Sequence, residues 1–149
     1  MSARAEVEEG WVVMEVKGLL LDPASETPVL LLQSSDGALL LPIWIGQVEA
    51  NSIAVALEGI REPRPMTHDL IHGILVELAI ELVRIEVWAL REGTFIGRLR
   101  LCRGEERCEV DSRPSDAIAM AVRTGAPIWV ARTVLDEALQ LDLAMLGKE

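Results

Sequence analysis

The sequence predicts a single α/β (α+β) domain in which helices pack on a mixed sheet built from two βββα-type halves. Two stretches of the chain alternate apolar and polar residues with the period of strands, and each is followed by residues spaced as in a helix. The chain has 149 residues, which is enough for one hydrophobic core and short for two domains. Half of the residues are hydrophobic and 26% are charged, a composition typical of globular proteins.

Three strands and a helix are expected in the first half. Residues 11–21 read as a strand that ends at a proline-containing loop. The second and third strands, 29–33 and 38–45, are joined by a hairpin turn at 35–37. Apolar residues then recur at helical spacing up to Gly59, a residue type that commonly ends helices.

A connector and a second helix follow. Residues 60–66 contain two prolines and should form a stiff, exposed connector. Thr67 is the expected cap of the helix, which carries an apolar stripe. The stripe consists of Leu70, Ile71, Ile74, Leu75, Leu78 and Leu82. Because so apolar a helix should not face water, we expect it to be central or to pack against a partner, and we predict a homodimer.

The second half repeats the order of the first. Strand patterns run from Val83 to Val110, broken by turns at Glu92-Gly93 and near Gly104, and a helix extends from Pro114 to Gly125. A shift of 65 positions aligns residues 53–57 with 118–122, and three of those five positions are identical, which suggests an internal duplication. A last short strand at 128–130 and a last helix at 134–143 complete the expected fold.

The ends of the chain differ from its middle. Residues 1–10 form an acidic N-terminal extension, 11–140 the domain, and 141–149 a C-terminal tail. We find no targeting signal, and the longest apolar run is too short for a membrane span, so a cytoplasmic protein without membrane contact is expected. Cys102 and Cys108 flank a turn, and we expect two reduced thiols more than a disulfide.

Charge is distributed unevenly along the chain. The net charge is −10, yet residues 61–132 hold 11 arginines against 11 acidic residues. An acidic chain is a poor non-specific binder of nucleic acid, because phosphate contacts need basic side chains. Any phosphate binding should therefore be local to the arginine-rich middle, or helped by a divalent cation.

The residues with the most distinctive chemistry lie in the stretch from Val110 to Pro127. Asp111 and Asp116 flank Arg113 at the N-terminus of the predicted helix, beside Ser115. First-turn amides and the helix dipole favour an anion, and paired carboxylates favour a metal ion. This segment could hold an anion, a metal ion, or both.

Three segments, IWIGQVEANSIAVALEG, PRPMTHDL and VDSRPSDAIAMAVRTGAPIWV, resemble the bifunctional nuclease domain family in order and spacing. The resemblance extends from about Met14 to Val134. It implies a compact mixed α/β domain that forms homodimers, and an activity on DNA and RNA reported for some members. The residues that match the family motifs are Glu49, Glu58, Arg64, His68, Asp69, Asp111, Arg113, Ser115 and Asp116.

These matches lead to a hypothesis of phosphodiester cleavage. Asp111 and Asp116 would hold Mg²⁺ or Mn²⁺, and Arg113 would grip a phosphate oxygen. The same hypothesis places Arg64 and Ser115 with the substrate. It makes His68 the acid or base, oriented by Asp69 or by another carboxylate.

Structural explanations stay open for the same residues. Asp116 would stabilise a helix N-terminus in any protein, and Asp111 with Arg113 could form an ion pair that reaches Glu49 or Glu58. His68 could simply make a hydrogen bond. Two functional classes therefore remain: a metal-dependent nuclease, and a non-catalytic dimeric module that binds a phosphate-bearing ligand or a partner protein.

Overall fold

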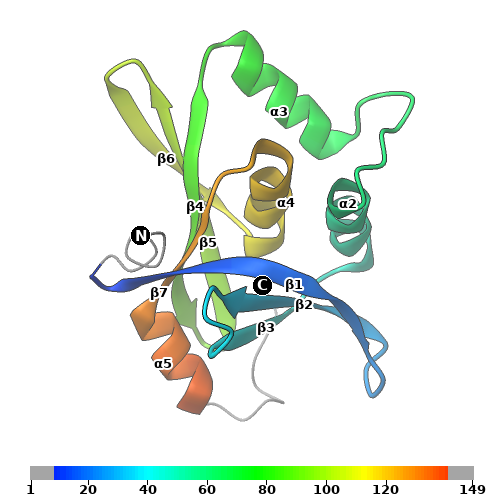
Figure 1. Ribbon diagram of the computed structural model, residues 1–149, viewed down its shortest axis with the longest axis vertical. Helices are drawn as coiled ribbons and strands as arrows, with labels where there is room; N and C mark the ends of the chain where they lie inside the picture. Colours follow the sequence, from blue (N-terminus) through cyan, green and yellow to red (C-terminus); the bar gives the residue numbers. More distant parts are fainter. Residues whose placement is uncertain (1–8, 141–149) are drawn as a thin grey trace.

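The computed structural model describes residues 9–140 and contains one continuous seven-stranded sheet in the order β3-β2-β1-β7-β4-β5-β6 (Figure 1). β4 and β7 are parallel, and every other neighbouring pair is antiparallel. The predicted mixed α/β fold is confirmed. Most of the predicted N-terminal extension and the whole predicted tail, residues 1–8 and 141–149, lie outside the described residues.

The first half is an antiparallel meander followed by a helix, as predicted. Its elements are β1 (Trp11–Asp22), β2 (Thr27–Ser34), β3 (Leu40–Trp44) and α2 (Gln47–Leu57). Buried and less buried residues alternate along β3 and from Leu30 to the end of β2, because successive side chains of a strand point to opposite faces. Gly59, just beyond the helix, has a φ of 69°, which a glycine adopts at little cost.

The second half repeats this arrangement and confirms the expected βββα order. It comprises β4 (Glu81–Arg91), β5 (Thr94–Arg103), β6 (Glu106–Ser112) and α4 (Pro114–Thr124). The β5–β6 register pairs Leu101 with Cys108 and Cys102 with Arg107, so the cysteines are not opposite one another and both are free thiols.

β7 (Ile128–Ala131) joins the two halves by pairing with both β1 and β4, and α5 (Arg132–Gln140) follows it directly. The last helix thus begins two residues earlier than the predicted Val134, and the predicted residues 141–143 lie outside the described part of the chain. α2 and α4 pack against each other, and α4 also contacts β4 and β5 (Figure 1). Large core side chains come from both halves, including Met14, Leu30, Ile85 and Ile118.

α3 (Thr67–Glu77) departs most from the prediction. Its N-cap is Met66, whose amide donates to Asp69 Oδ2 at 3.0 Å, so Thr67 is the first helical residue and not the cap. Of the expected stripe only Leu75 in this helix is buried, because α3 packs on α4 through one side.

Two residues of the expected stripe lie beyond the end of α3. Leu78 follows the helix and is exposed, while Leu82 is buried in β4. Leu70 and Ile74 are 57% and 48% exposed on the outer side of α3. In the described residues no helix is long and apolar enough to cross a membrane.

Candidate active site

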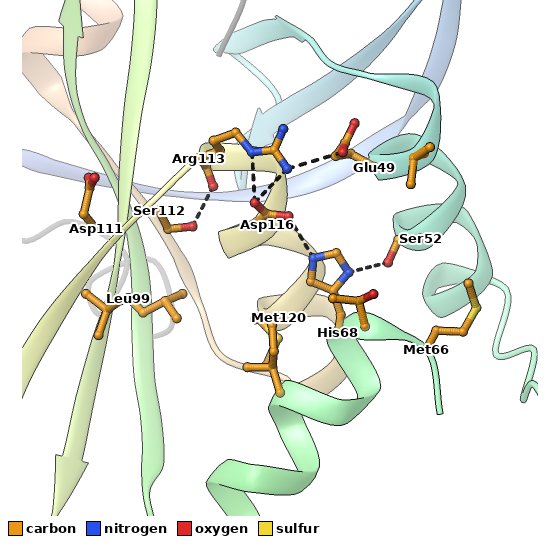
Figure 2. A pocket seen from close by; sticks show the side chains of 14 residues that line it. Glu49, Ser52, Met66, His68, Leu99, Asp111, Ser112, Arg113, Asp116 and Met120 are labelled. Atoms are coloured by element: carbon orange, nitrogen blue, oxygen red, sulfur yellow. Dashed lines mark hydrogen bonds and ion pairs between the residues drawn. The ribbon is translucent and has the colours of Figure 1, made fainter. Parts of the chain in front are cut away.

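A cavity of about 500 Å³ lies where α2, the start of α3 and the β6–α4 junction meet (Figure 2). Because it is the candidate active site, we call it the active-site cavity. Leu99, Val110 and Met120 supply apolar lining, and the other side carries charged and hydroxyl groups. His68 and Arg113, which stand far apart in the sequence, both line it. The THD segment and the β6–α4 junction thus meet at one cavity.

A continuous chain of hydrogen bonds and ion pairs crosses one wall of the cavity (Figure 2). Arg113 Nη2 lies 3.3 Å from Glu49 Oε2, and Arg113 Nε donates to Asp116 Oδ2 at 3.0 Å. Asp116 Oδ1 is 2.9 Å from His68 Nε2, and His68 Nδ1 is 2.6 Å from Ser52 Oγ. One chain of contacts therefore links α2, α3 and α4.

Local sequence positions these groups. Arg113 is the N-cap of α4 with an extended backbone, and Pro114 starts the helix, so Asp116 falls in the first turn where the helix dipole favours a carboxylate. Gly97 in β5 lets this turn approach the sheet. A Cβ at that position would come within 3.1 Å of the Ser112 carbonyl oxygen and 3.2 Å of Pro114 Cα, closer than most side chains tolerate.

Proton positions in the chain follow from donor and acceptor rules. An ionised Asp116 only accepts, so His68 Nε2 carries a proton and donates to it. His68 Nδ1 then accepts the Ser52 hydroxyl proton when the ring is neutral, and donates to Ser52 Oγ when the ring is charged. The connectivity is that of a Ser–His–Asp relay with the two ring nitrogens exchanged.

The residues of this chain of contacts differ in how much of their side chains is exposed to solvent. The side chain of Arg113 is 53% exposed and that of Asp116 is 34% exposed. His68 and Ser52 are buried behind them, and both ring nitrogens of His68 are already in contact with protein groups. Arg113 and Asp116 are therefore the ionic groups of this chain best placed to touch a bound molecule.

Asp69 does not orient His68; Asp116 does. Asp69 Oδ1 accepts from Arg123 Nε at 2.8 Å, and its other oxygen accepts from the Met66 amide. These hydrogen bonds, that of Arg123 first, lower the pKa of Asp69 below its usual value. Asp69 is not among the residues that line the active-site cavity.

The other predicted site residues are dispersed. Ser115 is fully buried in α4 and Arg64 is exposed in the connector; neither lines the cavity. Asp111 borders it, but residues alternate along β6, so its side chain is directed to the opposite face from Val110 and Ser112. In Figure 2 the Asp111 carboxylate stands apart from Asp116.

The donor set fits a divalent metal poorly as it is placed. Both oxygens of Asp116 already receive hydrogen bonds, from His68 and Arg113. Within residues 9–140 no three His, Cys, Asp or Glu side chains converge as metal ligands usually do. The Asp111–Asp116 pair expected to bind the metal is not assembled in this arrangement.

Ser52 was not predicted as a site residue. A serine beside the buried Ala50 and Ile53 of α2 is itself a signal, because a buried hydroxyl is nearly always hydrogen-bonded. Its partner could not be identified without knowing which face of α3 approaches α2. For Glu49 the sequence offered an ion pair with Arg113 as one explanation, and Glu49 is paired with Arg113.

The fold and the cavity together define a class: a mixed α/β domain with an arginine, a carboxylate–histidine pair and a buried hydroxyl around one cavity, a site suited to phosphate groups. More specifically, the chain belongs to the bifunctional nuclease domain family, whose sequence profile matches residues 30–142.

Individual proteins are also similar to this chain in sequence. An uncharacterised protein of Mycobacterium tuberculosis is 42% identical over 125 residues, which cover 84% of this chain and 74% of the relative. Bifunctional nuclease 1 of Oryza sativa subsp. japonica is 28% identical over 118 residues, covering 77% of this chain and 36% of the relative. Bifunctional nuclease 1 of Arabidopsis thaliana is 28% identical over 107 residues, which cover 69% of this chain and 33% of the relative. The match thus spans about a third of the plant proteins.

Proposed function

We propose that this chain is a nuclease that hydrolyses phosphodiester bonds of DNA and RNA in the active-site cavity. The observation that carries the proposal is the Glu49–Arg113–Asp116–His68–Ser52 chain in the wall of that cavity. The names of the plant relatives support the reaction class.

Each group has a role in this mechanism. Arg113, half-exposed, binds a non-bridging phosphate oxygen and stabilises the charge that develops on it. A carboxylate has about four lone-pair positions, so Asp116 can accept a further hydrogen bond from the attacking water and act as its general base. His68 and Ser52 position Asp116. The Asp116 side chain is 34% exposed, so the proton that it takes from water passes to the departing oxygen or to solvent, and the attacking oxygen replaces that departing oxygen on phosphorus.

Dependence on Mg²⁺ or Mn²⁺ stays a prediction that the same assay tests. Because the placed donors fit a divalent ion poorly, no step of this mechanism is routed through one. Arg64, in the exposed connector, stays the predicted second contact to the nucleic acid. The full burial of Ser115 argues for a structural role in α4 in place of substrate contact.

The test is cleavage of labelled single-stranded and duplex oligonucleotides with Mg²⁺, Mn²⁺ or chelator. The wild type should cut, and the Asp116→Asn and Arg113→Gln variants should each lose about 100-fold or more of the rate, the usual scale for a general base or a charge-stabilising donor. Asp136→Asn is the matched control, because Asp136 is exposed on α5. Cutting that persists in both site variants would locate the activity elsewhere or in a contaminant.

A second function is favoured by one observation. Both ring nitrogens of His68 are occupied by protein partners, as expected of a structural histidine. The alternative is a non-catalytic module that binds a phosphate-bearing ligand through Arg113. A thermal-shift screen of nucleotides should then show a stabilised wild type and an unresponsive Arg113→Gln variant, and no response from the wild type would reject this module.

We also propose that the protein forms a homodimer through the outer side of α3. Leu70, Ile74, Val76 and Leu78 are exposed there, beside a hollow of about 630 Å³ that they line. A contiguous apolar surface of this kind is uncommon on a monomer, and a twofold arrangement would bury it against its own copy.

Light scattering at micromolar concentration tests the dimer. The wild type should have the mass of two chains, and Val76→Glu should have the mass of one. Leu139→Glu makes the same kind of change at an exposed leucine on α5 and should leave the dimer intact. A monomeric wild type would reject the proposal.

A further inference from the structure

A carboxylate is buried among three arginines away from the active-site cavity. Glu86 in β4 has no exposed surface, and it accepts from the Nε atoms of Arg98 at 2.5 Å, Arg84 at 2.7 Å and Arg100 at 3.2 Å. Burial alone would raise the pKa of Glu86, but the hydrogen bonds from these arginines outweigh it and lower the pKa. The cluster is therefore held together in its charged form.

Tryptophan rings pack against two of these arginines. The Arg84 guanidinium lies 4.0 Å from the centre of the Trp129 ring, and that of Arg98 lies 4.7 Å from the centre of the Trp88 ring. A guanidinium has five N–H donors, and Glu86 uses only the Nε donor of Arg84. The terminal N–H groups of Arg84 are thus held in place without a hydrogen-bond partner among residues 9–140.

A second cavity, of about 390 Å³, opens over this cluster; we call it the arginine cavity. Its lining includes Arg84, Arg100, Arg107 and one carboxylate, that of Glu109, which pairs with Arg100 at 2.8 Å. Arg107 is exposed and has no ion-pair partner in the described part of the chain.

The charge balance of this region is opposite to that of the whole protein. Four arginines, Arg84, Arg98, Arg100 and Arg107, share this face with three carboxylates, Glu86, Glu109 and Asp111, which leaves one positive charge. The chain as a whole carries a net charge of −10. An anion that avoids most of the surface would be attracted here.

The two cavities border the same edge strand. β6 is at the edge of the sheet, with Arg107 at the arginine cavity and Asp111 at the rim of the active-site cavity. Both side chains are on the face of β6 opposite that of Val110 and Ser112, so a strand that leaves the arginine cavity must pass round this edge to enter the active-site cavity. Arg107 and Asp111 are four positions apart, or about 13 Å at the rise of a β-strand. An extended chain with regularly repeated phosphates can span that distance.

We infer that the arginine cavity binds the phosphate backbone of a single-stranded polynucleotide whose reacting phosphate lies in the active-site cavity. The inference rests on the proposed nuclease function and names the strand on which it acts. Arg107 makes the outermost contact. Arg84, held by Glu86 and Trp129, and Arg100, held by Glu86, present further donors.

Binding of the full chain to a labelled oligo-dT of ~12 nucleotides, followed by fluorescence anisotropy in chelator, tests this inference. Arg107→Gln should weaken binding several-fold and flatten the salt dependence by about 0.7 in log–log slope, one single-strand phosphate contact. Between about 50 and about 200 mM salt the advantage of the wild type should therefore shrink about 2.6-fold. Arg132→Gln removes the same charge from an exposed position on α5 and should bind with the wild-type slope.

Equal affinities and slopes for the two variants would overturn the inference. So would displacement of the oligonucleotide by poly-glutamate as readily as by unlabelled oligonucleotide, because the cavity would then accept any acidic chain. The measurement needs no turnover. Arg107-dependent binding by a protein that cuts nothing would reject the nuclease alone, and cleavage that is indifferent to Arg107 would reject the arginine cavity alone.

Discussion

Replacing Glu86 with glutamine should destabilise the fold far more than the same change at Glu109. Glu86 is fully buried and accepts three arginine hydrogen bonds, whereas the side chain of Glu109 is 48% exposed. Removing one partner of a buried charge network costs about 3–5 kcal/mol, and an exposed ion pair contributes about 0–1 kcal/mol. Because the arginines stay partly solvated and glutamine can still accept a hydrogen bond, we expect about 3 kcal/mol for Glu86→Gln.

Urea unfolding of the wild type, Glu86→Gln and Glu109→Gln measures this difference directly. The pH dependence adds a second check. The pKa of Glu86 is lowered in the fold, so its contribution is complete above the unfolded-state pKa of about 4.3 and is lost as pH falls through the folded pKa. The gap between wild type and Glu86→Gln should hold at neutral pH and shrink in acid. A gap below about 1 kcal/mol at neutral pH, or one equal to that of Glu109→Gln, would refute the reasoning.

Three further outcomes follow from the site. Ser52→Ala leaves His68 Nδ1 buried without its partner and should cost about 1–3 kcal/mol in urea unfolding, while Ser52→Thr, which keeps a hydroxyl, should recover part of the loss. Asp69→Asn should leave cleavage unchanged, and because Asp69 is 39% exposed, it should lower stability by only about 1 kcal/mol or less at neutral pH. That loss should vanish in acid, since the pKa of Asp69 is lowered in the fold. Gly97→Ala should lower both stability and cleavage by crowding the start of α4, whereas Gly18→Ala, where a Cβ meets nothing within 4 Å, should not.

The strands of the sheet could be predicted because the alternation of apolar residues and the residue types of turns are properties of short segments of sequence. The alternation of apolar residues and the glycines at turns identified both meanders, and β7 was expected at its observed place. α3 was predicted less well, because it is apolar on more than one side. Periodicity shows that a helix has an apolar face, but not which of two such faces meets the core.

Half of the candidate site was predictable for a related reason. Arg113 and Asp116 were found from their place at a helix N-terminus, a local property, and His68 from the family motif. Ser52 and the true partner of Asp69 depend on how helices pack, which a single sequence does not contain. The predicted pairing of Asp111 with Asp116 is not seen, because the two are close in sequence but the Asp111 side chain is directed to the other face of β6.

The arginine–carboxylate contacts also resolve the conflict between an acidic protein and a polyanionic substrate. At both cavities an arginine Nε binds a carboxylate that lies behind it, Asp116 behind Arg113 and Glu86 behind Arg84. The negative charge then fixes the guanidinium, and because the acid is the more buried partner in each pair, the arginine is the group more open to a phosphate. The remaining acid excess lies in the terminal parts of the chain, 13 acidic against 3 basic residues outside 61–132. It should repel a strand that approaches elsewhere and thereby favour the path along β6.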